Sequence, residues 1–276
     1  MGRRHLDIVA LAAAALIAPL AALAADAPTD RAAQTSAAAE RGELIYRLDQ
    51  AAWVATDALL KDIADPQARG VAGWIVTEEA DGLRVIFYSD SDVPAAVYTA
   101  QVRDGKVVSA RLVEAGEDAR LSESEVRMVR ARQAASRQKV TPCTAAAMNT
   151  VVIPPSADEE RVEVYLMSSQ VKAKEYPFGG HYLYAIAPDG EVVSRRPFTK
   201  GCLNLSTVAP DGKGTVAGMV LTHYLDPHPT EIHVFVSRRS GLPVYVMTPP
   251  ADAKQADEAP LWYVRGKSIE LARPGD

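Results

Sequence analysis

The chain has 276 residues, of which 48% are hydrophobic and 24% are charged, with a formal net charge of -5 and two cysteines. This composition excludes a disordered, collagen-like or disulfide-dense protein. Because the charge balance is acidic and Lys and Arg are spread along the chain, nucleic acid is not expected as a partner. A globular protein of one or two domains remains; its partner is unknown and no cofactor is implied.

The first 24 residues show the three regions of a secretory signal peptide. A basic start precedes an uncharged apolar run over 8–24, which ends in Ala22-Leu23-Ala24, a small-residue cleavage pattern. A membrane anchor is the alternative, but the run is Ala-rich, contains Pro19 and is shorter than the roughly 20 residues of a spanning helix. We expect residues 1–24 to be removed, no membrane span in the mature chain, and a periplasmic or secreted location.

Two segments follow this signal. Residues 25–39 are mostly Ala, Thr, Asp, Gln and Ser without a periodic apolar face, which predicts a flexible leader. Residues 40–138 are expected to form an N-terminal α+β portion, because apolar residues three or four apart predict a helix over 43–63 and a period of two follows it.

Two local signals refine this N-terminal portion. Asp104-Gly105 lies between two β-rich runs and predicts a hairpin. Ser122 and Glu125 have the spacing of a capping box, which predicts a second helix that ends near Gln138. We therefore expect a long helix, a small antiparallel sheet and a capped second helix.

Residues 142–273 are expected to form a β-rich, antiparallel C-terminal portion. Short runs rich in Val, Ile and Tyr alternate here with Pro, Gly, Asp and Ser, and the predicted strands lie at 161–167, 182–187, 191–195, 231–237 and 242–247, followed by a last pair of strands within 262–271. Asp189-Gly190 and the segment 238–241 predict hairpins. The fold class is therefore α+β; a single continuous sheet shared by both portions is the alternative.

The two cysteines, Cys143 and Cys202, lie in the expected mature chain. An even number of cysteines in an oxidising compartment favours a disulfide between them. Closing a loop of about 60 residues with this disulfide would stabilise the fold by about 4 kcal/mol in the chain-entropy model.

A polar cluster over 223–233 contains three of the five histidines of the chain. Four of its residues, His223, Asp226, Glu231 and His233, are of the types that bind Zn²⁺. If 231–237 were a strand, Glu231 and His233 would share one face. The alternative, which we favour, is that these histidines are structural and hydrogen-bonded to carboxylates, so that no metal is assigned.

A second candidate site combines a histidine and a cysteine. His181 precedes the segment Thr199-Lys-Gly-Cys-Leu-Asn204, which resembles the signature of the L,D-transpeptidases over about 24 residues, with Lys200 where that family has its second His. The resemblance implies that Cys202 is a thiolate nucleophile and His181 its base. A disulfide to Cys143 would remove that thiolate.

Neither candidate has the complete residue pattern of an enzyme site, so we expect an exported, non-catalytic binding or envelope-associated module. The loops at 176–184 and 223–233 supply aromatic and imidazole groups suited to recognition. The alternatives are a cell-envelope hydrolase or transpeptidase-like cysteine enzyme that uses Cys202 and His181, and a metal-binding protein that uses the 223–233 cluster.

Overall fold

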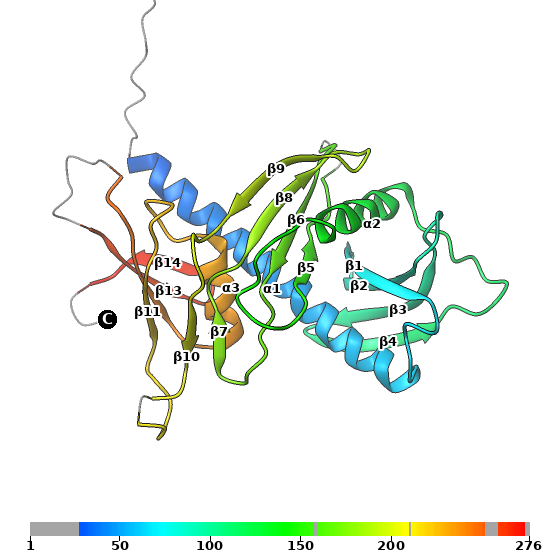
Figure 1. The fold of residues 1–276 in the computed structure, drawn as a ribbon, viewed down its shortest axis with the longest axis horizontal. Helices are drawn as coiled ribbons and strands as arrows, with labels where there is room; N and C mark the ends of the chain where they lie inside the picture. The colour runs from blue at the N-terminus through cyan, green and yellow to red at the C-terminus, as the bar shows by residue number, and fades with distance from the viewer. Residues whose placement is uncertain (1–27, 157–158, 210, 252–258, 274–276) are drawn as a thin grey trace, which may run out of the picture.

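The computed structural model describes residues 28–156, 159–209, 211–251 and 259–273. Three helices occur among them: α1 (Pro28–Asp62), α2 (Glu123–Ser136) and α3 (Glu231–Ser240). They combine with several antiparallel sheets, so the expected α+β fold is confirmed (Figure 1). Within these described ranges, no helix has the length and apolarity needed to cross a membrane. The expected signal peptide at 1–24 lies outside the described residues and stays a prediction.

The strands form three four-stranded sheets and one two-stranded sheet within the described residues. The first sheet has the order β1 (Val71–Glu79), β2 (Gly82–Ser89), β3 (Ala96–Arg103), β4 (Lys106–Leu112). The second has the order β5 (Asn149–Val152), β6 (Val162–Met167), β8 (Tyr182–Ile186), β9 (Val192–Pro197). The third has the order β11 (Met219–Thr222), β12 (Val244–Met247), β13 (Leu261–Arg265), β14 (Ser268–Leu271), and the small sheet pairs β7 (Glu175–Pro177) with β10 (Asn204–Ser206).

Two of the predictions made from local sequence signals are confirmed by the structure. Asp104 and Gly105 both have positive φ and turn β3 into β4, as the predicted hairpin requires. At the start of α2, the backbone N–H of Ser122 donates to Glu125 Oε2 at 2.8 Å, and the Glu125 N–H donates to Ser122 Oγ at 3.3 Å. The predicted capping box is therefore confirmed.

Helix α1 is much longer than predicted, and the flexible leader is wrong over 28–39, which is helical. Residues 25–27 lie outside the described part. Thr35 and Ala38 are buried, but they are too small to produce a clear apolar period. Ala favours helix strongly, and the buried face of this segment is built from small side chains, so its sequence looked like a polar leader.

The predicted strand at 231–237 is wrong, because this segment forms α3. Its residues are buried on every side, so neither the period of a strand nor that of an amphipathic helix was visible. The helix begins after Thr230, whose backbone N–H donates to His233 Nδ1 at 2.9 Å. The predicted hairpin at 238–241 is also wrong: Gly241 ends α3 in the left-handed conformation, with φ of 72°.

Helix α3 also changes the topology of the third sheet. It connects β11 to β12, and these two strands pair in parallel, whereas the other strand pairs of the described sheets are antiparallel. A parallel pair needs a long crossover connection, which α3 supplies.

The hydrophobic core continues across the expected boundary between the two portions. Helix α1 runs along the molecule from the β13–β14 end to the β4 end, and α2 lies between the first and second sheets (Figure 1). One buried cluster joins Phe87 of β2 with Val151 of β5, and a second joins Ile86 with Val164 around Met128 of α2. The division into 40–138 and 142–273 stays a prediction, but both helices pack on strands from each side of it.

Helices α1 and α3 are in close contact at Gly42. A Cβ atom at this position would lie 2.5 Å from Val234 Cβ and 2.7 Å from the carbonyl oxygen of Glu231. Only glycine fits this spacing without displacement of a helix. The contact sets the distance between the two helices that frame the pocket described below.

We predict that Gly42→Ala destabilises the protein by about 1–3 kcal/mol, because the added methyl group overpacks the α1–α3 contact. Helix propensity alone would favour Ala by about 1 kcal/mol, so a net loss identifies the contact as the cause. Urea denaturation measures the difference. Gly201→Ala is the control, since no atom lies within 4 Å of a Cβ at that position. Equal midpoints for the two variants would contradict the prediction.

Candidate functional site

The predicted disulfide is confirmed. Cys143 and Cys202 are bonded with an S–S distance of 2.10 Å and a Cα–Cα distance of 5.2 Å, and neither cysteine is free. The sulfur of Cys202 is therefore not a thiolate in this structure, and a thiolate is what the transpeptidase-like interpretation requires.

Two glycines allow the chain to pass closely beside this disulfide. A Cβ on Gly180 would lie 2.9 Å from Cys143 Sγ, and a Cβ on Gly179 would lie 2.5 Å from the carbonyl oxygen of Gly201. These residues precede His181, which is 1% exposed. The Gly-Gly-His sequence is explained by close packing around the disulfide.

The His181 ring is fixed in a neutral state. Its Nε2 lies 3.0 Å from the carbonyl oxygen of Pro177, which only accepts, so Nε2 carries the proton. Its Nδ1 is buried without a hydrogen-bond partner among the described residues. Burial lowers the pKa of His181 to about 4. A neutral imidazole with a free lone pair is compatible with a base, but its cysteine partner is already bonded.

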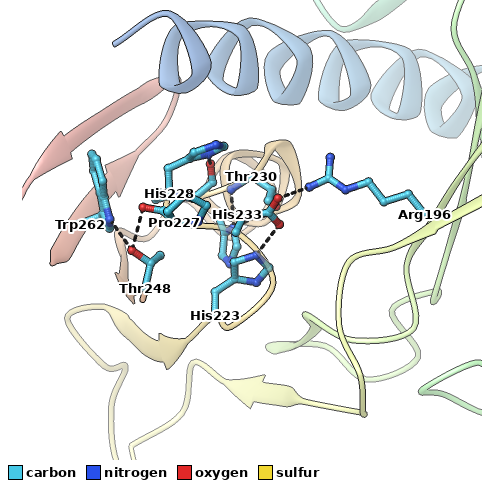
Figure 2. A network of polar contacts seen from close by, with 10 residues as sticks. Arg196, His223, Pro227, His228, Thr230, His233, Thr248 and Trp262 are labelled. Atoms are coloured by element: carbon cyan, nitrogen blue, oxygen red, sulfur yellow. Dashed lines mark hydrogen bonds and ion pairs between the residues drawn. The ribbon is translucent and has the colours of Figure 1, made fainter. Parts of the chain in front are cut away.

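His223 and His233 form a second group of buried imidazoles (Figure 2). Their ring centroids are 5.0 Å apart in an edge-to-face arrangement. Burial, together with the neighbouring His223, lowers the pKa of His233 to about 3. His233 Nδ1 accepts the capping hydrogen bond from Thr230, so this ring is neutral and serves the helix start.

Asp226 links His223 to an arginine on β9. His223 Nε2 donates to Asp226 Oδ2 at 2.8 Å, and Arg196 Nη2 donates to Asp226 Oδ1 at 2.8 Å (Figure 2). Burial alone would raise the pKa of Asp226, but the hydrogen bond from His223 and the charge of Arg196 lower it. The carboxylate therefore stays ionised, with each oxygen hydrogen-bonded.

The loop between β11 and α3 is held by polar contacts on its other side. Thr248 Oγ1 accepts a hydrogen bond from Trp262 Nε1 at 2.9 Å and donates one to the carbonyl oxygen of Pro227 at 3.1 Å (Figure 2). These contacts anchor the loop that carries His223 and Asp226 to the third sheet. Hydrogen bonds within the protein therefore explain the positions of His223, Asp226 and Pro227.

Glu231 is not part of this histidine network. Its Oε1 accepts a hydrogen bond from the Tyr165 hydroxyl of β6 at 2.9 Å. On a helix, residues two apart point in different directions, so the shared face that we predicted for Glu231 and His233 does not exist. In the described part of the chain, no group of three or more His, Cys, Asp or Glu side chains is placed to hold a metal ion.

A pocket of about 250 Å³ opens between α1, α3 and the ends of β5 and β6, and we call it the α1–α3 pocket. Its apolar walls include Trp53, Trp74, Met148, Met167, Tyr176 and Phe235. Its polar lining includes Asp49, Asn149 and Arg239. An apolar pocket with a few convergent polar groups is the usual form of a small-molecule site.

The polar lining of this pocket is a buried charge network. Asp49 is 2% exposed and accepts hydrogen bonds from Asn149 Nδ2 at 2.6 Å and from Arg239 Nη1 at 3.1 Å. Burial raises the pKa of Asp49, while Arg239 and Asn149 oppose the change. The Arg239 guanidinium also lies 4.8 Å from the ring centroid of Trp53, a cation–π contact.

The disulfide fixes one wall of the pocket. The backbone N–H of Cys143 donates to Ser168 Oγ at 2.9 Å, and Thr144 Oγ1 donates to the carbonyl oxygen of Ser169 at 2.8 Å. Ser169 Oγ in turn donates to the carbonyl oxygen of Ala147 at 2.6 Å. The segment 143–149 is thus tied to the end of β6, and the disulfide ties it to the segment after β9.

The sequence analysis did not identify this pocket. Its lining comes from segments far apart in the chain, and Trp53 and Trp74 looked like ordinary packing residues. The one available signal was Asp49, a carboxylate beside Leu48 on the apolar face of the predicted first helix. Of the predicted recognition loop at 176–184, Tyr176 and Pro177 line the pocket.

Comparison of the chain with protein-family models, with curated proteins and with solved structures gives no match.

We predict that the protein loses stability as the pH falls from about 7 to 4. His181 and His233 stay neutral in the folded state until pH values of about 4 and 3, whereas unfolded histidines take up a proton near pH 6.5. The unfolded state therefore binds more protons in this window, and protonation favours unfolding.

Two substitutions test this assignment. His181→Gln retains an N–H donor for Pro177, and His233→Asn retains an acceptor near the Thr230 N–H, but neither new side chain titrates. Each is expected to flatten the pH dependence of the unfolding free energy by up to about 1.4 kcal/mol per pH unit, measured by urea denaturation. Profiles with the slope of the wild type would show that neither histidine is responsible.

Proposed function

We propose that this is an exported, non-catalytic binding protein that takes a small, largely apolar ligand in the α1–α3 pocket. The observation that carries the proposal is a pocket with aromatic walls and a buried, hydrogen-bonded charge network at one side. Its volume of about 250 Å³ lies slightly below the usual range of drug-sized sites, which favours a ligand of about one ring.

The charge network indicates which polar group the ligand carries. The ionised pair Asp49–Arg239 is neutral as a whole, so a charged ligand would add an uncompensated charge to a partly buried site. Arg239 has five N–H donors, and only one donates to a partner among the described residues. The carbonyl oxygen of a neutral ligand would accept a hydrogen bond from one of the remaining N–H groups of Arg239.

The export part of the proposal rests on two separate features. The N-terminus has the basic, apolar and cleavage regions of a signal peptide. The Cys143–Cys202 disulfide is of a kind that persists in oxidising compartments. A mature N-terminus at Ala25 in protein recovered from the periplasm or medium tests this part.

We predict that benzamide, an uncharged ring with a carbonyl group, saturably changes the tryptophan fluorescence of the protein. Trp53 and Trp74 line the pocket, so a bound ring would alter their environment. Trp53→Ala is expected to weaken binding by about tenfold or more, since an aromatic contact contributes about 0.5–1.5 kcal/mol beyond the area it buries. Trp53 is 51% exposed, so this variant should fold.

Controls separate the pocket from non-specific binding. Tyr224→Ala removes an aromatic side chain that is 76% exposed outside the pocket, and it should bind benzamide like the wild type. Benzylamine and benzoate, which add a charge to the same ring, should bind more weakly than benzamide. Absence of a saturable change with all three compounds, or equal affinity of the wild type and Trp53→Ala, would overturn the proposal.

A further inference from the structure

A second hollow, of about 860 Å³, is lined by α2, by the start of β1 and by the loop between β2 and β3, and we call it the α2 hollow. One wall is α2, with Arg130, Arg132 and the helix-capping Arg137. The other wall includes Asp90 and Asp92, in the loop between β2 and β3.

The arginines on the α2 wall lack an acidic partner. Arg130 and Arg137 are seven residues apart, two helical turns, and both side chains are exposed. Neither makes an ion pair within the described residues. Two guanidinium groups on one helix face, each free to form paired hydrogen bonds, suit a carboxylate.

Arg132 is held in place between these arginines and the first sheet. Its Nη1 donates to the Tyr88 hydroxyl at 3.1 Å, and its guanidinium lies 4.4 Å from the ring centroid of Trp74. It also has no carboxylate partner in the described part of the chain. The charge of Arg132 is therefore held by aromatic contacts and is not compensated by a carboxylate of the described residues.

The β2–β3 loop contributes negative charge to the lining of the hollow. Ser89 Oγ and Ser91 Oγ are 3.0 Å apart, and Ser91 Oγ donates to the carbonyl oxygen of Val93 at 2.7 Å. Asp90 and Asp92 are exposed and form no ion pair among the described residues. Charges of both signs thus line one hollow without neutralising each other.

We propose that the α2 hollow binds a short zwitterionic peptide, with its carboxylate on Arg130 and Arg137 and its ammonium on Asp90 and Asp92. The two aspartates would repel a polyanion, and the three arginines would repel a polycation. A molecule with one charge of each sign satisfies both walls. The hollow shares no lining residue with the α1–α3 pocket, although Arg132 of the hollow contacts Trp74 of the pocket, and this proposal does not depend on the function proposed for that pocket.

Trialanine, which carries both free termini, is a suitable probe for isothermal titration calorimetry. We expect N-acetyl-trialanine and trialanine amide, each without one charge, to bind about fivefold more weakly than trialanine, which corresponds to a loss of about 1 kcal/mol. Equal binding of trialanine and N-acetyl-trialanine would replace the proposal by a simple anion site. No detectable binding of trialanine at millimolar concentration would also overturn it.

Paired variants assign each end of the peptide. Arg130→Gln with Arg137→Gln should weaken trialanine binding and make it insensitive to amidation of the carboxylate. Asp90→Asn with Asp92→Asn should make it insensitive to acetylation. Lys139→Gln removes a nearby exposed charge outside the hollow and should leave trialanine affinity unchanged. Benzamide binding, measured in the same variants, should stay at the wild-type level, so failure of one proposal is distinguishable from failure of the other.

Discussion

The close contact between α1 and α3 determines where the remaining parts of the molecule lie. Gly42 lets α1 approach α3 without a side chain between them, and α3 lies at the same time between α1 and the third sheet. The helix register defined by this contact brings Asp49 to Arg239 and Glu43 to Arg238. A wider spacing would separate these charges and leave Asp49 buried without its cation, which costs far more than an exposed ion pair contributes.

The α1–α3 pocket follows from the same arrangement. The α1 and α3 walls meet at the Asp49–Arg239 pair, and the disulfide at Cys143 restrains the segment that leads to β5, which also lines the pocket. The two features have different consequences. The helix contact sets the width of the pocket, whereas the disulfide restrains a segment without regular structure, which would otherwise sample many conformations.

The sequence allowed prediction of the elements whose signals are local. The capping box at Ser122, the Asp104-Gly105 hairpin and the Cys143–Cys202 disulfide depend on residues whose chemistry leaves few alternatives. The first turns of α1 and the whole of α3 could not be identified in this way. The former bury small side chains, and the latter is buried all round, so tertiary packing, and not periodicity, determines their structure.

The candidate sites show the same difference between what local sequence signals predict and what tertiary packing determines. Sequence proximity suggested that Glu231 and His233 act together, but the helix sends one to Tyr165 and the other to Thr230. The residues of the α1–α3 pocket are instead separated by up to 190 positions along the chain, as Asp49 and Arg239 are, and no local pattern connects them. The role of His181 as a base and the binding of metal by His223, Asp226, Glu231 and His233 stay predictions.

The most direct test of the account is ¹⁹F NMR of protein labelled with 5-fluorotryptophan, titrated with benzamide. The three tryptophans occupy different environments: Trp53 and Trp74 line the α1–α3 pocket, while Trp262 is buried against Thr248 in the third sheet. The account predicts that the resonances of Trp53 and Trp74 shift together and saturably, and that the resonance of Trp262 stays in place. A shift of Trp262 alone, or three unchanged resonances, would contradict it.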